Sequence, residues 1–437
     1  MNIKKFRKKM ILIFSLIFIY FYTCNIAYAD TIPENNPRLY CNNNILMDAE
    51  SGNILYEKNG YAKIYPASTT KVLTAILVLE NLPLDEKIVA SKNAINSVPL
   101  ESSVMGIKKE EIFSVENLLY GLLLSSGNDA AIVLAESVSG NVNDFVTLMN
   151  TKAKEIGCLN THFSNPHGFY DDNHYSTPYD MALILKYAMK FDEFKKIVES
   201  KSFELPSTNK TPNTRTIKNT NKLIDENSNT FYKYALGGKT GYTIESRGTY
   251  IGYSKNGDKI LIVGNFDGSQ NINGKNARFL DAISLCDYGF FNFDKEKIVT
   301  KDTFNFSFID KNTNTKSSIS LKDDIYSLTR KNNYITITPT LNLSDTNNIK
   351  INLKIKGNNL DINNTYDSIC SSSNYFSLKN ILSENFSYII LSILIIILYI
   401  LIKKLRINNK KIKNKYNNRT KHKQINKYIY IYYSVCH

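Results

Sequence analysis

The chain has 437 residues, enough for more than one domain with a sizeable core. Its net charge of +14 does not indicate nucleic-acid binding, because the excess sits at the ends: residues 1–10 carry five basic residues and no acid, and residues 403–437 carry eleven and no acid. The remainder is close to neutral, a distribution that favours membrane topology over a basic binding face. We expect no nucleic-acid partner.

The cysteines and histidines predict neither a disulfide framework nor a metal site. Six cysteines are few and scattered, and no CxxC pair occurs. Pairing stays possible in principle among four of them: Cys41, Cys158, Cys286 and Cys370. His162, His167 and His174 cluster, but not at helical ligand spacing, and we interpret them as structural. We expect no metal and no cofactor.

Residues 1–29 read as a secretory leader. A basic segment ending at Lys9 precedes an apolar run from Met10 to Cys24, and Ala27-Tyr28-Ala29 has the small-x-small pattern of a cleavage site. The mature chain would then begin near Asp30. An uncleaved membrane anchor is the alternative.

A β-hairpin and a buried helix follow. The runs Asn44–Ala49 and Asn53–Tyr56 flank the turn Glu50-Ser51-Gly52 and predict two paired strands. The apolar run Val72–Leu79 predicts a buried helix that begins just after Pro66.

Ser68 and Lys71 stand at the start of that helix, three residues apart and therefore on one face. The unpaired N–H groups and the dipole of a helix N-terminus favour developing negative charge there. Serine becomes a nucleophile when a neighbouring base takes its proton, and a lysine whose ammonium is disfavoured by burial can be that base. The alternative is that Ser68 merely caps the helix.

Two more helices are predicted downstream, with an apolar segment between them. Ser114 can cap a helix that runs to Leu123 and ends at the turn Ser125-Ser126-Gly127-Asn128. An apolar segment then spans Ala130–Val138, and Tyr179–Met189 is amphipathic.

The periodicity changes to that of strands near Leu236-Gly237-Gly238-Lys239-Thr240-Gly241. Thr249–Ser254 and Lys259–Gly264 predict a hairpin that turns at Asn256-Gly257-Asp258. A final helix is expected over Ala277–Tyr288. Helices packed on an antiparallel sheet make residues 30–295 an α/β (α+β) domain.

The rest of the chain changes composition. Alternating apolar residues over 296–370 predict a small all-β domain, followed by a linker over 371–385. Residues 386–402 form an uncharged apolar run of seventeen residues and predict a transmembrane helix. The basic tail 403–437 would be cytoplasmic and the domains before the span extracellular. A buried core helix at 386–402 is the alternative.

Three short motifs together carry the functional prediction. They are Ser68-x-x-Lys71, Ser126-Gly127-Asn128 and Lys239-Thr240-Gly241. In this order they resemble the signature of the penicillin-recognising serine enzymes, S-x-x-K, then S-x-N, then K-T-G. The chain is more closely similar to the low-molecular-mass penicillin-binding proteins that are D-alanyl-D-alanine carboxypeptidases. That family shares the S-G-N middle motif, the segments Asn165–Gly168 and His174–Thr177, and Asp287–Phe290 ahead of a β-rich domain.

The resemblance implies a penicillin-binding, β-lactamase-like transpeptidase fold and a role for each site residue. Ser68 would attack the carbonyl between two D-alanines with Lys71 as base, and Ser126 would relay a proton to the leaving amine. The substrate-binding residues would be Asn128, Lys239, Thr240, Tyr242 and Arg278. The backbone N–H groups of Ser68 and Tyr242 would form the oxyanion hole.

The substrates and inhibitors follow from the same resemblance. The enzyme would remove the terminal D-alanine from peptidoglycan pentapeptide stems through an acyl-enzyme during cell-wall maturation, and β-lactams would trap Ser68. Cleavage of peptide cross-links, and use in growth or in sporulation, stay open.

Arg278 is the candidate for binding the substrate's terminal carboxylate, since a lone lysine is a weak anchor and arginine binds carboxylates bidentately. Arg247 is the competing arginine. A surface arginine without a role is the third possibility. The sequence Glu245-Ser246-Arg247-Gly248 departs from the Glu-Ala-Gly that commonly follows K-T-G in the family, which leaves the local loop geometry open.

Other functions fit less well. A P-loop would need Gly at position 233, which is Lys. A class A β-lactamase needs a deacylating Glu in Glu-x-x-Leu-Asn, but Glu155 precedes Leu159-Asn160 by one residue too many. A non-catalytic penicillin-binding surface protein is a further alternative, disfavoured because unused buried polar groups cost stability.

Overall fold

The structure is a computed structural model that describes residues 37–269, 272–302, 304–310, 315–330, 336–342, 350–357 and 360–370. The described residues from Leu39 onward belong to one compact unit. The predicted leader, linker, membrane span and basic tail lie outside the described residues. Among the residues that are described, no helix is long and apolar enough to cross a membrane.

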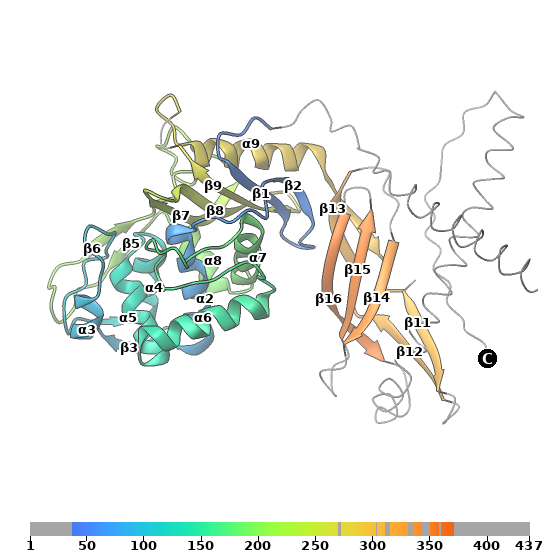
Figure 1. The fold of residues 1–437 in the computed structure, drawn as a ribbon, viewed down its shortest axis with the longest axis horizontal. Coiled ribbons are helices and arrows are strands. Elements are labelled where there is room, and N and C mark those ends of the chain that lie inside the picture. Colours follow the sequence, from blue (N-terminus) through green and yellow to red (C-terminus); the bar gives the residue numbers. More distant parts are fainter. Residues whose placement is uncertain are drawn as a thin grey trace, which may run out of the picture. The chain divides into compact units, whose positions relative to one another are not determined.

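A five-stranded antiparallel sheet of order β2-β1-β9-β8-β7 organises the first part of the chain (Figure 1). Its strands are β1 (Asn43–Asp48), β2 (Ile54–Lys58), β7 (Ala235–Thr243), β8 (Arg247–Asn256) and β9 (Lys259–Gly268). The structure confirms both predicted hairpins, β1–β2 and β8–β9. Their turns lie where Gly52 and Gly257 adopt positive φ angles of 79° and 61°, which a residue without a Cβ tolerates.

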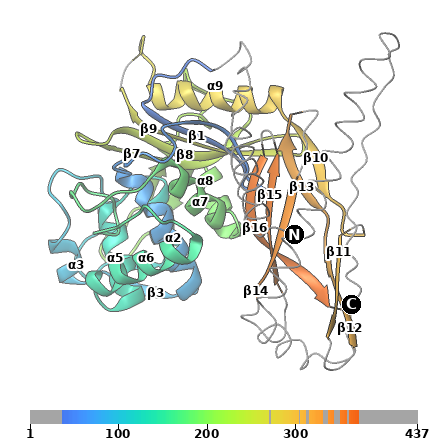
Figure 2. The same ribbon diagram turned by 45° about the vertical axis from the view of Figure 1, so that its right-hand side comes forward.

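The sheet separates two hydrophobic clusters because strand side chains alternate between its faces. Along β1, Ile45 and Met47 join the larger cluster beneath the sheet, while Leu46 joins the smaller cluster with α9 (Ala277–Asn292). Figures 1 and 2 show α9 across one face and the other helices below the opposite face. α9 is longer than predicted, and Gly289 and Phe290, both buried, extend its apolar face.

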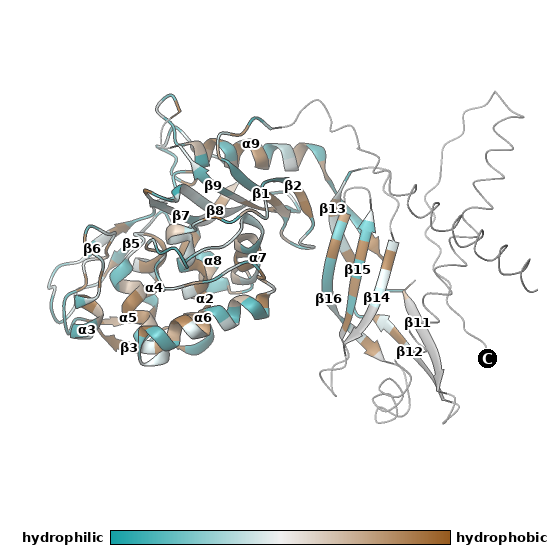
Figure 3. Cartoon of the chain, in the orientation of Figure 1, coloured by the Kyte–Doolittle hydropathy of each residue, from teal (hydrophilic) through white to brown (hydrophobic). Residues whose placement is uncertain are grey.

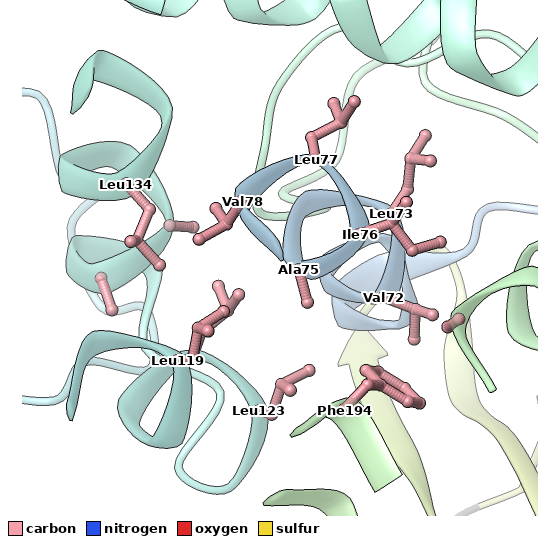
Figure 4. Close-up of a cluster of buried hydrophobic side chains, with 14 of the residues drawn as sticks. Val72, Leu73, Ala75, Ile76, Leu77, Val78, Leu119, Leu123, Leu134 and Phe194 are labelled. Atoms are coloured by element: carbon pink, nitrogen blue, oxygen red, sulfur yellow. The ribbon is translucent and has the colours of Figure 1, made fainter. Parts of the chain in front are cut away.

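The helices below the sheet surround α2. They are α2 (Lys71–Asn81), α4 (Val115–Leu123), α5 (Asn128–Ser139), α6 (Val142–Ile156), α7 (Pro178–Ala188) and α8 (Asp192–Glu199). Every residue from Val72 to Val78 of α2 is buried, and all of them but Thr74 are apolar, so the helix lies in the middle of the layer. Figure 4 shows its side chains packed against Leu119 and Leu123 of α4, Leu134 of α5 and Phe194 of α8.

Local capping explains where several of these helices begin. The Ser114 side chain accepts a hydrogen bond from Asn117 N, as the sequence predicts for α4, and Asn141 and Thr177 cap α6 and α7 in the same way. The helix expected directly after Pro66 begins instead with a 3-10 turn, η1 (Ala67–Thr70), which leads into α2. The smaller elements are β3 (Lys87–Val89), α3 (Lys92–Asn96), β4 (Ile112–Ser114), β5 (Ser202–Leu205) and β6 (Arg215–Lys218).

The last described part is all β, as expected. β10 (Asp294–Val299) pairs with β13 (Ile325–Thr329), and a second five-stranded sheet has the order β11-β12-β16-β15-β14. These strands are β11 (Asn305–Asp310), β12 (Thr315–Leu321), β14 (Thr336–Asn342), β15 (Lys350–Gly357) and β16 (Leu360–Cys370). Ile351, Leu353 and Ile355 are buried in its own cluster. Figure 3 shows the alternating hydropathy of β14 and β15 that predicted these two strands.

Candidate active site

The 3-10 turn η1 presents Ser68 at the edge of the helical layer. The turn is held by the Pro66 carbonyl, which accepts hydrogen bonds from Thr69 Oγ1 at 2.7 Å and from Thr249 Oγ1 of β8 at 3.1 Å. Ala67 has a φ of 48°, a backbone conformation that a non-glycine residue adopts only under constraint. Ser68 is half-buried beside β7.

Lys71 lies at the centre of the site and is fully buried. Its Nζ is 2.8 Å from Ser68 Oγ, 2.7 Å from Asn128 Oδ1 and 2.7 Å from the His167 carbonyl oxygen. Burial lowers the pKa of Lys71 well below its ordinary value, the nearby Lys239 lowers it further, and Asp129 opposes both.

These contacts suit a neutral amine. A neutral lysine has two N–H groups and one lone pair, and the Asn128 and His167 oxygens can each accept one N–H. The lone pair of the neutral amine would then accept the Ser68 hydroxyl proton across the 2.8 Å contact between Nζ and Oγ. The predicted nucleophile and base are therefore brought within hydrogen-bond distance by the fold.

The turn before α5 carries the middle motif. Ser126 is buried, with a φ of 63°, and no hydrogen bond of its hydroxyl is found within the described part of the chain. Asn128 is fixed at both ends, since its N donates to Ser103 O at 2.8 Å and its side chain accepts from Lys71. Ser126 thus has a hydroxyl that is not committed to another protein group.

Asp129 supports this turn and was not singled out from the sequence. Its buried carboxylate accepts hydrogen bonds from the backbone N–H groups of Met105, Gly106 and Ile107 at 2.8, 2.8 and 3.0 Å. It thereby fastens the loop before β4 to the turn that holds Asn128. An aspartate directly after an S-x-N motif is a local signal, but its partners are backbone groups of a distant loop.

β7 forms the opposite wall. Gly241 lets the strand pass close to the nucleophile, because a Cβ there would lie 2.7 Å from Ser68 N and 2.5 Å from Thr249 Oγ1. Thr240 shares a 2.7 Å hydrogen bond with Thr220 through the two hydroxyls. Tyr242 follows with its side chain 53% exposed. The Gly of the third motif is thus required by close packing of β7 against η1.

Lys239 is the second fully buried lysine of the site. Its Nζ donates to the Thr240 carbonyl oxygen at 2.8 Å, and burial, followed by the charge of Arg278, lowers its pKa to about 7. No carboxylate is recorded as its partner among the described residues. A buried cation beside a second cation and a carbonyl is a site that a bound anion stabilises.

Arg278 reaches β7 from the start of α9. Its Nη1 donates to Gly241 O at 2.6 Å and to Thr249 O at 3.3 Å. Arg247 instead lies 3.5 Å from Asp267 in a half-exposed ion pair. The predicted helix does aim Arg278 at the Lys239 strand, whereas Arg247 has a carboxylate partner of its own.

The segment Glu245–Gly248, which departs from the family pattern after the third motif, leads from the β7–β8 turn into β8. Ser246 Oγ accepts from Thr243 N at 2.9 Å, and Thr243 Oγ1 accepts from Ser246 N at 3.0 Å. Arg247 then has a φ of 52°. The altered residues therefore form a closed turn and leave β7 extended through Thr243.

The segment that contains the three clustered histidines lies behind Ser68. Gly168 has a φ of 82°, and a Cβ there would overlap the Ala67 carbonyl. His174 Nδ1 accepts from Ser164 N at 3.1 Å, so Nε2 carries the proton and donates to Thr70 Oγ1 at 2.8 Å. Burial lowers the pKa of His174 to about 3. His174 thus fastens this segment to η1, in agreement with a structural role.

Among the described residues no group of three or more His, Cys, Asp or Glu side chains could hold a metal ion. Cys41, Cys158 and Cys286 are free, buried thiols.

Sequence reasoning missed the His167 carbonyl as well as Asp129. Lys71 contacts the backbone oxygen of residue 167, so the residue type at that position does not predict the contact. The available signal was the segment Asn165-Pro166-His167-Gly168, whose turn residues predict a tight bend. Asn165 Oδ1 accepts from Gly168 N at 2.7 Å and shapes that bend.

Comparison with known proteins agrees with this geometry. Residues 30–269 match the family model described as D-alanyl-D-alanine carboxypeptidase. The chain is 34% identical over 219 residues to the Bacillus subtilis protein named D-alanyl-D-alanine carboxypeptidase DacF, covering 49% of this chain and 54% of that protein. It is 33% identical over 248 residues to the Mycobacterium tuberculosis protein named DacB2, covering 56% of this chain and 81% of that one.

Solved structures resemble the same part of the chain. The Streptomyces K15 DD-transpeptidase has a TM-score of 0.53 and 31% identity, over 58% of this chain and 98% of that one. A D-alanyl-D-alanine carboxypeptidase from Mycobacterium tuberculosis H37Rv has a TM-score of 0.54 and 31% identity, over 60% of this chain and 94% of that one.

Proposed function

This chain belongs to the serine D-alanyl-D-alanine carboxypeptidase family, the low-molecular-mass penicillin-binding proteins. From this we propose that it is a serine hydrolase acting in cell-wall maturation, that Ser68 is its nucleophile, and that it removes the terminal D-alanine from peptidoglycan pentapeptide stems. The observation that carries the proposal is the contact of Lys71 Nζ with Ser68 Oγ at 2.8 Å, held by two further acceptors on a buried lysine.

Acylation begins with proton transfer. Lys71 takes the Ser68 hydroxyl proton while Ser68 Oγ bonds to the carbonyl carbon between the two D-alanines. The carbonyl oxygen becomes an oxyanion, which the backbone N–H groups of Ser68 and Tyr242 stabilise. The close approach of Gly241 to Ser68 N supports this pairing of η1 with β7.

The leaving group departs next. The C–N bond breaks, and its nitrogen receives a proton from Lys71 through the Ser126 hydroxyl, leaving D-alanine and an ester on Ser68. Ser126 suits the relay because it lies two residues before Asn128, which contacts the base, and because its hydroxyl has no hydrogen-bond partner in the described part of the chain. Asn128 orients Lys71 and binds the substrate amide. Water then hydrolyses the ester.

The terminal carboxylate is bound at β7. Lys239 and the Thr240 hydroxyl on β7 would contact it together with Arg278, which reaches the same strand, and a buried lysine beside a half-buried arginine gains stability from a bound anion. Arg278 has the further role of holding β7 through Gly241 O. This arrangement favours a substrate with a free C-terminus over an internal peptide bond.

β-Lactams resemble the D-alanyl-D-alanine amide, and we propose that they acylate Ser68 and are released slowly. The β-lactamase alternative needs a carboxylate that activates the deacylating water. Glu155, the nearest sequence candidate, pairs with Lys152 at 2.8 Å on the half-exposed side of α6, which disfavours that role.

The location is proposed from the sequence. A leader over 1–29, a membrane span over 386–402 and a basic tail over 403–437 would place the catalytic domain outside the cell, the tail in the cytoplasm and the enzyme at the membrane. The substrate, being part of the wall, requires the catalytic domain to be outside.

The direct test is product analysis. The protein is incubated with a muramyl pentapeptide and the products are weighed by mass spectrometry. We expect loss of one D-alanine and no loss in Ser68→Ala. An unchanged pentapeptide with wild-type protein, or cleavage that persists in Ser68→Ala, contradicts the assignment.

A further inference from the structure

Aromatic side chains gather on the surface beside the nucleophile, outside the site described above. We name this set the aromatic rim: Tyr65, Phe169, Tyr170 and Tyr175, with Lys63. The Tyr65 and Tyr170 rings meet edge to face, with centroids 5.0 Å apart. Lys63 Nζ lies 4.6 Å from the centre of the Tyr175 ring and 5.6 Å from that of Tyr65. Three aromatic rings and Lys63 are thus in contact at the surface, and Phe169 is the exposed sequence neighbour of Tyr170.

The rim borders the reactive turn through the chain itself. Tyr65 is three residues before Ser68, so their Cα atoms lie at most about 11 Å apart. Tyr170 is two residues after Gly168, whose Cα packs against the Ala67 carbonyl. The rim and the site are therefore continuous.

The rim is open to solvent and held in place. Phe169 is 44% exposed, whereas Tyr65, Tyr170 and Tyr175 are half-buried. The Tyr170 hydroxyl donates to Asp172, and Ile64 pairs with Ser176 through backbone hydrogen bonds of 2.8 and 3.0 Å. Exposed aromatic groups on ordered backbone commonly mark a binding surface.

We propose that the aromatic rim binds the glycan strand to which the stem peptide is attached, by stacking of sugar rings on Tyr170 and Phe169. A pyranose ring has an apolar face of C–H groups, which suits an aromatic ring, and an edge of hydroxyl and acetamido groups, which suits the polar tips of Tyr65, Tyr170 and Lys63.

Reach and charge favour this occupant. A pentapeptide spans at most about 17 Å when extended, so a stem whose end lies at Ser68 can carry its sugar to the rim. Asp171 and Asp172 are exposed beside Lys63, a mixed charge that disfavours an anionic lipid surface. The proposal rests on the proposed function for the identity of the glycan. It makes the rim a determinant of specificity for stems attached to a strand.

The test compares one peptide in two forms on the full-length protein: the free pentapeptide, and the same pentapeptide on a chain of several disaccharides. The rim variant is the double substitution Phe169→Ala and Tyr170→Ala. We expect it to raise KM for the glycan-borne substrate about tenfold, the effect of one to two lost stacking contacts. KM for the free pentapeptide and kcat for both should stay within about twofold.

Two further variants serve as controls. Phe231→Ala removes an aromatic ring of similar exposure, 42%, from the segment before β7 and should change neither substrate's KM. Tyr170→Phe keeps the aromatic ring, so its KM for the glycan-borne substrate should stay close to the wild-type value. Equal KM changes for the two substrates, or none in the rim variant, overturn the proposal.

A binding measurement separates this proposal from the proposed function. Calorimetry with peptide-free glycan chains needs no hydrolysis. Binding by wild-type protein that is lost in the rim variant supports the rim even if no peptide is cleaved, in which case only the proposed function fails. Absence of glycan binding, together with normal cleavage of the free pentapeptide, overturns the proposal for the aromatic rim and leaves the proposed function intact. A protein partner would then be the next occupant to test.

Discussion

The two buried lysines of the site, Lys71 and Lys239, are both fully enclosed, yet their surroundings differ. Lys71 has three oxygen neighbours within 2.8 Å, of which one is the Ser68 hydroxyl. Lys239 has the Thr240 carbonyl and lies near the charge of Arg278. The first arrangement satisfies a neutral amine, and the second is completed by an anion. The same residue type can therefore serve as a base in one pocket and as a carboxylate anchor in the other.

Replacing Lys71 by arginine should give the largest effect. Arginine keeps the charge but cannot deprotonate, so it cannot take the Ser68 proton. We expect acylation by a β-lactam to slow by about 10²–10⁴-fold, the usual contribution of a general base. Stopped-flow acylation rates measure it.

Lys196→Arg is the matched control, since the Lys196 side chain is 66% exposed on α8 and should tolerate the change. Thermal melting shows whether Lys71→Arg still folds. Acylation at the wild-type rate in a folded Lys71→Arg protein would mean that Ser126 or a water is the base. It would also contradict the assignment of Lys71 as base and Lys239 as carboxylate anchor.

Arg278→Ala tests the second lysine, Lys239, as part of a carboxylate-binding site. If Lys239 and Arg278 together bind a carboxylate, loss of Arg278 should lower kcat/KM for a free D-alanyl-D-alanine terminus by about tenfold or more. A substrate whose terminus is amidated, or an ester without the carboxylate, should lose much less. Steady-state kinetics on the matched substrates measure the difference.

The control is Arg247→Ala, which breaks only the ion pair with Asp267. It should leave both substrates nearly unchanged. Equal losses on all substrates in Arg278→Ala would instead indicate damage to β7 through the lost bond to Gly241 O. No loss would leave the carboxylate to Arg247 or to Lys239 and Thr240.

The smallest expected effect is on pH dependence. Burial lowers the pKa of Lys239 to about 7, so its charged fraction falls as the pH rises through neutrality. Because a carboxylate binds the charged form, KM for a free-carboxylate substrate should rise by up to about tenfold between pH 6 and pH 8. A carboxylate-free ester should show no such rise. The same rise for both substrates would remove Lys239 as its cause.

The sequence predicts most of the fold because its signals are local. The spacing of Ser68 and Lys71, the cap at Ser114 and the turn at Gly257 depend on neighbouring residues, and the structure confirms each. β11, β14 and β15 of the all-β part were predictable from alternation in the same way. The 3-10 turn at Ala67 was not, because it results from contacts of Pro66 with β8.

The site was predictable as a set of side chains but not as an arrangement. The His167 carbonyl contacts Lys71 through a backbone atom, and the Asp129 carboxylate binds backbone groups of a distant loop. Contacts of these two kinds cannot be predicted from residue type. The packing of Gly241 against Ser68 N likewise becomes evident only when β7 is placed beside η1. Long-range contacts of this kind follow from the fold, not from a local pattern.

Covalent labelling of Ser68 tests the central claim most directly. Wild-type protein and Ser68→Ala are incubated with a β-lactam, and the intact masses and the peptide that carries the adduct are determined. The account predicts an added mass of one β-lactam on the peptide containing Ser68 in the wild type and none in Ser68→Ala. An adduct that persists in Ser68→Ala, or that maps to another residue, contradicts it.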